Sequence, residues 1–331
     1  MPETANVTQQ APRAVTSRFR ASFANLGLIG TLAALMILFS VLSPYFLTFG
    51  NISNLLLAVS VIGTMAAIST LVIIGRSLDL SVGSIAALTG VATAIVIEQY
   101  KLPWGAGMAV GLAAGALCGA FNGAMVSWLR INPIIATIGT LSLFRGVAFI
   151  LTDGQTVLIE SEAILFFGSG RLLGIPLSVW VFGLIVALAH VFAERTSPGR
   201  AVFALGASPR AALVAGVRIQ HYRFWLLVAS GVSAGLAGVM LIGQAGTAIP
   251  SAAGAYELLV ITAVLLGGTS LAGGQGSVLR TLLGVLIIGV LNNGMILLAV
   301  PSFYQISANG LLLLIAVAID QLKHRKDTEV E

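Results

Sequence analysis

The chain has 331 residues and a net charge of +5; 57% of its residues are hydrophobic and only 9% are charged. A soluble protein of this length needs far more charged residues to cover its surface, so the composition excludes that class. The 38 glycines are spread through apolar stretches, where small residues let membrane helices pack closely. The sequence therefore predicts an all-α membrane protein, a polytopic helical bundle of about ten transmembrane helices.

Ten apolar runs approach the roughly 20 residues that one helix needs to cross the hydrocarbon core. In chain order, the expected spans are Asn25 to Ser43, Ile52 to Ile74, Ser81 to Ile97, Trp104 to Trp128, Pro133 to Leu151, Ile175 to Ala193, Tyr222 to Gln244, Glu257 to Leu271, Val278 to Ala299 and Phe303 to Ile319. The run from Glu257 is short, so nine spans are the alternative. Residues 25–320 then form the membrane domain, between an N-terminal tail at 1–24 and a C-terminal tail at 321–331.

Several kinds of site are excluded by the residues that the sequence lacks. Cys118 is the only cysteine, which excludes disulfides and cysteine-based metal sites. The three histidines have no metal-ligand spacing, and none of the three lysines follows a glycine, so no Walker A loop can be written. We expect no metal site, no cofactor and no enzyme activity in this chain.

The basic residues predict the orientation of the chain. If the N-terminus is cytoplasmic and ten spans alternate, fourteen of the 17 lysines and arginines fall in cytoplasmic segments: Arg13, Arg18, Arg20, Arg76, Arg130, Arg195, Arg200, Arg210, Arg218, Arg223, Arg280, Lys323, Arg325 and Lys326. Membrane proteins show this positive-inside bias. It places both termini in the cytoplasm and explains the net charge without a nucleic-acid partner.

Two connections are long. The outer segment from Thr152 to Gly174 is too apolar for a loose tether; it caps the outer mouth, meets an external partner or is a re-entrant structural loop. The inner segment, about 194–223, is the longest cytoplasmic connection and the richest in arginine.

A short helix is predicted inside this inner segment, because it contains a helix start and a helix stop. Ser208 is a good N-cap, Pro209 suits the first helical position, and Gly216 is a natural stop. Two turns are not stable alone in water, so the helix must dock either on its own bundle or on another protein. Its candidate residues are Ser208, Pro209, Arg210, Ala211, Ala212 and Gly216.

Three stretches in one collinear order carry a resemblance to a known family: Leu78–Ser84, Gly206–Val217 and Tyr256–Ser277. In this order, they resemble the Ile-Asp-Leu-Ser-Val-Gly-Ser signature, the cytoplasmic coupling segment and the glycine-rich C-terminal block of permease subunits of ribose-type sugar ABC importers, within the branched-chain-amino-acid/ribose permease superfamily. The resemblance covers roughly residues 26–322.

The resemblance implies the transmembrane permease subunit of an ATP-binding-cassette importer for a sugar or related polyol, in the bacterial plasma (inner) membrane. It also implies three protein partners: a cytoplasmic ATPase subunit, which uses the ATP; a periplasmic or extracellular sugar-binding protein; and a second permease chain, in a homodimer or a heterodimer. The alternative function is a secondary transporter driven by an ion gradient. Such a transporter needs an ionisable relay at mid-membrane, whereas Asp79 and Glu257 are expected near span ends.

The family signature supplies four candidate residues, Asp79, Ser81, Gly83 and Ser84. Arg76 and Ser77 stand where the family usually has two glycines. Because Arg76 precedes Asp79 by three residues, we expect an ion pair between them, with Asp79 in local pairing or capping rather than in transport. The Leu271–Gln275 stretch is similar to the ATPase signature Leu-Ser-Gly-Gly-Gln, but without a Walker A loop we expect it to form a sharp turn at the inner membrane face.

A pathway for a neutral polyol needs hydrogen-bonding groups without strong charge. The candidates within the spans are Asn122, Gln244, Asn292 and Asn293, each of which could instead bond between helices. Arg145 lies inside a span, where a charged side chain implies a partner or a water-filled cavity. The sequence leaves its role open.

Overall fold

The computed structural model describes residues 13–328 of the chain, and the side chains of residues 26–322. Most of this part is helical, which confirms the predicted all-α membrane bundle. Eight helices are long and apolar enough to cross a membrane: α2 (Phe49–Ile74), α3 (Val82–Ala94) continued by the π-helix η1 (Ile95–Gln99), α4 (Trp104–Ser127), α5 (Pro133–Thr152), α7 (Leu177–Arg195), α10 (Ile219–Ala245), α12 (Val278–Leu297) and α13 (Ser302–Thr328).

Two shorter apolar helices bring the number found in the described residues to the predicted ten. One is residues 26–42 of α1 (Arg13–Leu42), and the other is α11 (Tyr256–Leu266). The expected span from Glu257 to Leu271 is therefore too long at its end, because the helix ends at Leu266 and Gly268, with a φ of +76°, turns the chain away.

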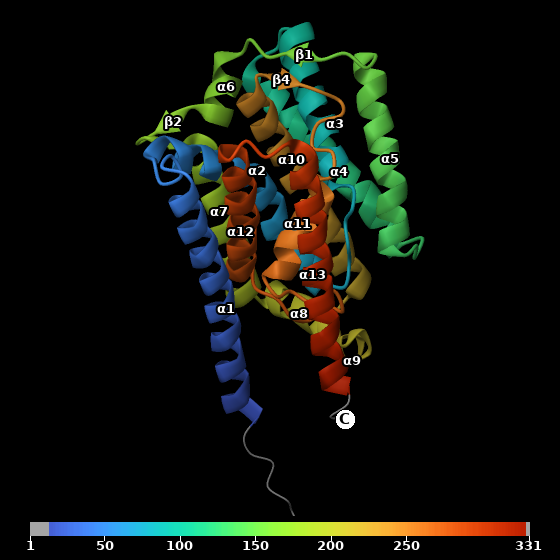
Figure 1. Cartoon of the computed structure of the whole chain (residues 1–331). Coiled ribbons are helices and arrows are strands. Elements are labelled where there is room, and N and C mark those ends of the chain that lie inside the picture. The colour runs from blue at the N-terminus through green and yellow to red at the C-terminus, as the bar shows by residue number, and fades with distance from the viewer. Residues whose placement is uncertain (1–12, 329–331) are drawn as a thin grey trace, which may run out of the picture.

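The two ends of the bundle differ in structure. One end carries α8 (Ser197–Ala207) and α9 (Pro209–Val214) and is called the loop-helix end; α1 and α13 also extend toward it (Figure 1). The other end, called the sheet end, carries β1 (Val157–Leu158) paired with β4 (Thr247–Ala248), the hairpin of β2 (Arg171–Leu172) and β3 (Ile175–Pro176), and the helix α6 (Glu162–Ser169).

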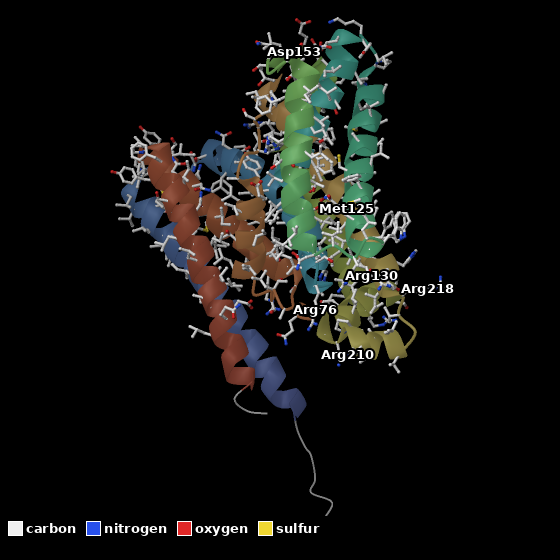
Figure 2. All side chains as sticks on the ribbon, turned by 90° about the vertical axis from the view of Figure 1, so that its right-hand side faces the viewer. Arg76, Met125, Arg130, Asp153, Arg210 and Arg218 are labelled. Carbon is white, nitrogen blue, oxygen red and sulfur yellow. The ribbon has the colours of Figure 1, made fainter. Side chains whose placement is uncertain are left out.

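Charge separates along the same axis. Figure 2 shows Arg76, Arg130, Arg210 and Arg218 close to the loop-helix end, with Asp153 at the opposite end. The long apolar helices between the two groups match the thickness of a hydrocarbon core. The bundle thus has one end rich in arginine and one end that is not.

Small residues hold the centre of the bundle together. On α4 and α10, Gly115 and Gly231 face each other so closely that a Cβ on either would overlap the carbonyl oxygen of the other. Without side chains the two helix backbones can touch, which is how small residues stabilise helix pairs in lipid. This explains why the glycines lie inside apolar spans.

The connection over residues 153–174 packs onto the bundle at the sheet end. Glu98 fixes the turn between β1 and α6, because one carboxylate oxygen accepts hydrogen bonds from the backbone N–H groups of Glu160 (2.9 Å) and Ser161 (3.1 Å). Ile164 is fully buried, and Gly168 lies against Gly243 of α10. The connection has the packing of a structural loop and also covers the sheet end.

Two helices begin inside the bundle rather than at its ends. α11 has 11 residues and so is about 16 Å long, roughly half the hydrocarbon core. Its last turn reaches the loop-helix end, where Gly267 packs against Thr281 at the start of α12, so its first residue lies near the middle of the bundle. Residues 249–255 lead down to it from the sheet end without helical structure.

α3 also begins inside the bundle, but the chain reaches its start from the loop-helix end. Residues 75–81 return from the end of α2 into the bundle as non-helical chain, and α3 begins beside Ser230 of α10. Ser230 follows the first residue of α10 by 11 positions, which is about 16 Å along that helix. The starts of α3 and α11 meet where Gly83 faces the carboxylate of Glu257.

Candidate functional site

The loop-helix end begins with two capped helices in sequence. The Thr196 hydroxyl accepts a hydrogen bond from the backbone N–H of Gly199 (3.0 Å) and caps α8. The Ser208 hydroxyl accepts from the N–H of Ala211 (3.3 Å) and caps α9, with Pro209 at its first position. The predicted helix start at Ser208 and Pro209 is confirmed.

The predicted stop at Gly216 is also confirmed. Gly216 has a φ of +83°, its N–H donates to the carbonyl of Leu213 (3.0 Å), and the N–H of Val217 donates to the carbonyl of Ala212 (2.9 Å). These two bonds form a Schellman motif, which satisfies the last carbonyls of a helix and requires a left-handed residue. Glycine adopts that conformation at low cost.

The side chains of α9 divide into an inner and an outer set. Ala212 is buried against the rest of the chain, whereas Arg210 and Ala211 are exposed. Leu213 and Val214 are 63% and 90% exposed, although they lie on a helix outside the long apolar spans. One alanine therefore anchors α9, and an arginine and two large apolar side chains remain available on its outer side.

A glycine junction connects α8 to the membrane core. Gly206 packs against the carbonyl of Ile74, the last residue of α2, and against the backbone of Gly274. The N–H of Gly274 donates to the same carbonyl (2.9 Å). Gly273 and Gly274 have φ values of +82° and +75°, which confirms that the stretch Leu271–Gln275 forms a sharp turn.

The expected ion pair between Arg76 and Asp79 is wrong. The Arg76 Nε donates to the carbonyl of Ala272 (2.6 Å) in the glycine turn, and Arg76 lies at the loop-helix end (Figure 2). Asp79 points instead into the bundle, where it is 4% exposed. The chain between the two residues is not helical, so a spacing of three does not bring their side chains together.

Asp79 is the centre of a buried hydrogen-bond network. Its Oδ1 accepts from the backbone N–H (2.9 Å) and the hydroxyl (2.6 Å) of Ser81, and its Oδ2 accepts from the hydroxyl of Ser230 on α10 (2.7 Å). Asn122 of α4 donates to the Ser81 hydroxyl (2.8 Å). The hydroxyl of Ser84 donates to the Ser81 carbonyl (2.8 Å). Asp79 thus makes local bonds to Ser81, the residue before α3, without capping the helix, and links to two other helices.

The four polar pathway candidates lie in three separate places. Asn122 belongs to the Asp79 network, and the Gln244 side chain donates to the carbonyl of Leu57 and the hydroxyl of Ser60 on α2. Asn293 and Asn51 exchange two hydrogen bonds of 2.9 Å, and Asn292 accepts from Asn309. Each therefore bonds between helices.

Asn292 and Asn293 also line a cavity of about 370 Å³ between α2 and α12, beside Asn51 and Asn54. The cavity is otherwise apolar, with Leu55, Val59 and Ile288 in its wall. Two of the four predicted polar residues therefore face open space here.

Arg145 and Glu257 form a second polar group at the middle of the bundle. The Arg145 guanidinium, on α5, donates to the carbonyls of Pro250 (3.0 Å) and Ala252 in the non-helical segment before α11. Glu257, in the first turn of α11, lies close enough to attract Arg145 electrostatically, and its Oε2 is buried without a hydrogen-bond partner. The sequence singled out Arg145 but missed this association, because its partners are backbone carbonyls more than 100 residues away.

Comparison with known proteins identifies the family. Residues 51–317 match the model of the family described as "Branched-chain amino acid transport system / permease component". The chain belongs to this permease family. It is 41% identical to the ribose import permease protein RbsC of Escherichia coli (strain K12) over 298 residues, which cover 88% of this chain and 92% of that protein.

Two further relatives are similar to this chain over most of its length. This permease is 39% identical to the RbsC protein of Bacillus subtilis over 291 residues, covering 87% of this chain and 90% of that protein. It is 36% identical to the D-allose transport system permease protein AlsC of Escherichia coli over 321 residues, covering 96% and 98%. These matches confirm the resemblance to the permeases of sugar importers.

The three motif stretches thus occupy three parts of the permease that touch one another. Leu78–Ser84 forms the entry to α3 and the Asp79 network, and Gly206–Val217 contains the end of α8 and all of α9. Tyr256–Ser277 contains α11 and the glycine turn. Gly83 meets Glu257 at mid-bundle, and Gly206 meets Gly274 at the loop-helix end. The motifs therefore connect the middle of the permease to its loop-helix end.

Proposed function

We propose that this permease is the transmembrane subunit of an ATP-driven importer and forms the pathway for a neutral sugar or related polyol. The membrane helices and the family membership support a transport role. The named relatives import ribose, allose and, for a further 35% identical relative, L-arabinose. All three are uncharged monosaccharides, so the transported molecule belongs to that chemical class.

The observation that carries ATP-driven coupling is the outer side of α9. Arg210, Leu213 and Val214 are exposed there, outside the apolar spans, on a helix too short to be stable alone. A charged residue beside two exposed apolar residues suits a protein interface, where apolar area provides affinity and a charge provides specificity. The partner is a separate ATPase subunit, which docks on α9 and uses the ATP.

The glycine junction gives the ATPase a mechanical route into the membrane. A displacement of α9 moves α8, and Gly206 of α8 bears directly on Ile74 and Gly274. Residues packed backbone to backbone transmit a shift, because no flexible side chain lies between them to absorb it. The shift reaches α2, and through residues 75–81 the start of α3.

The charge separation sets the proposed orientation. The loop-helix end holds the labelled arginines (Figure 2) and so faces the cytoplasm by the positive-inside rule, with both termini on that side. The sheet end then faces outward, and the covering loop with α6 receives a periplasmic or extracellular sugar-binding protein. The membrane is the bacterial plasma (inner) membrane, and a second permease chain, identical or homologous, completes the pathway.

The chain itself supplies no chemistry in this proposal. No Walker A loop can be written in its sequence, so ATP is bound by the partner, and no cofactor or metal ion is needed here. Among the described residues, no group of three His, Cys, Asp or Glu side chains is placed to hold a metal ion.

Transport in proteoliposomes tests the proposal. The permease, its ATPase and its binding protein are reconstituted together, and uptake of radiolabelled D-ribose, D-allose and L-arabinose is measured. Uptake of at least one sugar is expected to require ATP and the ATPase, and to continue when ionophores collapse the ion gradients. Uptake by the permease alone, driven by a proton or sodium gradient, would contradict the proposal.

One structural observation favours the alternative, a transporter driven by an ion gradient, and the same uptake experiment distinguishes the two functions. Asp79 and Glu257 were expected near span ends, but both lie near the middle of the bundle. Mid-membrane carboxylates are what a proton relay needs. However, Asp79 is fully engaged with serine hydroxyls and a backbone N–H, as expected of a structural group.

A further inference from the structure

The segment before α11 exposes polar backbone at the depth of the hydrocarbon core. Residues 249–255 are non-helical, and Ser251, Gly254 and Ala255 are exposed on the surface of the single chain. Leu258, in the first turn of α11, is 46% exposed, whereas residues 260–265 are buried. The helix therefore emerges from the core only at its mid-membrane start, on the side where α5 and α13 flank it (Figure 1).

Lipid cannot cover this part of the surface. Non-helical backbone at membrane depth occurs only where protein buries it or where it lines water, because lipid tails satisfy neither N–H nor C=O groups. The half-buried charges of Arg145 and Glu257 lie beside the same segment and have the same requirement. This face of the permease must therefore meet water or another protein chain.

The segment is also held in an unfavourable conformation. Ala253 and Ala255 have φ values of +53° and +64°, although neither is a glycine. Such residues cost free energy, and they persist where the surroundings hold them and cluster at functional sites. Arg145 holds this segment, because its guanidinium binds two of the segment's carbonyls on either side of Ser251.

We propose that residues 251–257 line the sugar pathway, that the Glu257 carboxylate accepts hydrogen bonds from sugar hydroxyls, and that Arg145 is the positioning residue for the segment. The inference rests on the proposed function, sugar import, and assigns the contact site within it. Sugar hydroxyls donate hydrogen bonds, and the Glu257 Oε2 is a carboxylate oxygen without a donor. This oxygen is buried against Gly83, where the starts of α3 and α11 meet, so the carboxylate turns away from Gly83 when it binds a sugar.

Cysteine accessibility tests whether the segment lines water. Cys118, the only cysteine, is buried and is replaced in a Cys118→Ala background. Gly254→Cys adds a side chain whose Cβ meets only an ordinary contact, the Ser251 carbonyl at 3.5 Å. The matched control is Leu184→Cys on α7, where leucine is 59% exposed toward the lipid side of a long span.

A charged, membrane-impermeant methanethiosulfonate reagent is applied to proteoliposomes that contain the permease, its ATPase and its binding protein. The reagent requires a thiolate, which forms in water but not in lipid. Gly254→Cys is expected to react and to lose uptake at least about tenfold, whereas Leu184→Cys should neither react nor lose uptake. A Gly254→Cys thiol that does not react means that a second chain or lipid covers the segment, and overturns the proposal.

Substitution of Glu257 tests the sugar contact. Glu257→Gln keeps the side-chain size but replaces a charged acceptor, and should slow uptake about tenfold. It should also reduce the discrimination between the transported sugar and its monodeoxy analogues, because the contact that distinguishes them is weakened. A purely structural defect slows all sugars equally, and that result would overturn the contact.

Arg145→Lys and Arg145→Gln test the positioning role. One guanidinium nitrogen of Arg145 donates to both carbonyls, and a lysine ammonium lies one atom short of its position. Both variants should therefore increase the reactivity of Gly254→Cys and slow the uptake of all sugars by the same factor. Unchanged reactivity would overturn the positioning role. If the unsubstituted complex takes up none of the three sugars, the proposed function has failed. If it takes up at least one sugar but the segment does not react, only this inference has failed.

Discussion

Gly206, the penultimate residue of α8, lies with its Cα against the backbone of Gly274, so closely that a Cβ at position 206 would overlap it. Two segments 68 positions apart thus touch through backbone alone. The contact ties the exposed helices of the loop-helix end to the end of α2, because both glycines also meet the Ile74 carbonyl.

Gly206→Ala is therefore expected to disturb coupling. The added methyl group forces α8 away from the glycine turn, and overpacking of this kind costs roughly 1–3 kcal/mol. Gly183→Ala on α7 is the matched control, because nothing lies within 4 Å of its Cβ. Sugar uptake in proteoliposomes should fall for Gly206→Ala and not for Gly183→Ala; equal uptake would show that the contact plays no part in coupling.

Arg210→Glu is expected to weaken docking of the ATPase. The substitution reverses an exposed charge in the first turn of α9 without touching the membrane core. The permease should reach the membrane at normal levels, but co-purification of the ATPase and sugar uptake should fall together. Arg171→Glu reverses an exposed charge in β2 at the sheet end and should leave ATPase binding unchanged. Full binding and full uptake with Arg210→Glu would mean that α9 is merely structural.

Gly216→Val is expected to disturb the end of α9 through backbone conformation alone. No atom lies within 4 Å of a Cβ at this position, but its φ of +83° is unfavourable for a β-branched residue. The cost is about 1–2 kcal/mol, enough to open the Schellman motif of so short a helix. ATPase co-purification should decrease, while Gly183→Val, in an ordinary helical position, should bind as the parent does. Intact binding by Gly216→Val would rule out a requirement for this helix end.

The Asp79 network predicts a non-additive pair of substitutions. Asp79→Asn keeps one acceptor oxygen and leaves the Ser230 hydroxyl without its carboxylate, at a cost of about 1–3 kcal/mol. Ser230→Ala removes that hydroxyl. The double variant should therefore lose much less free energy of unfolding than the two single variants lose together. Ser233→Ala, which loses only a bond to the Ser230 carbonyl, should be additive with Asp79→Asn in detergent unfolding experiments. Additivity of both pairs would contradict the network.

The proposed orientation predicts the location of the C-terminus. A reporter enzyme that is active only outside the cytoplasm, fused after Lys326, should give no signal, because the arginine-rich end is cytoplasmic. The same reporter inserted after Asp153, at the opposite end of the bundle (Figure 2), should be active. The reverse pattern would place α9 outside the cell and remove its ATPase partner.

The sequence by itself determined the features that depend on neighbours along the chain. Length and apolar composition specify membrane helices, and the caps of α9 depend on contacts within four residues, so Ser208, Pro209 and Gly216 are predictable. Successive connections lie at alternating ends of a bundle whose helices cross it. The connections rich in positive residues therefore fall at one end. The turn in the glycine-rich stretch after α11 was also predictable, because it depends on neighbouring glycines.

The tertiary structure alone decided the depth and the partners of the charged residues. An apolar run has the same composition in a half-helix as in a full span, so the mid-bundle start of α11 was not evident. Asp79 meets Ser230 across 151 positions, and Arg145 meets Pro250 across 105. Helical periodicity and propensity do not predict such distant contacts. They arise only when α3 and α11 enter the bundle from opposite ends and their first residues lie at the same depth.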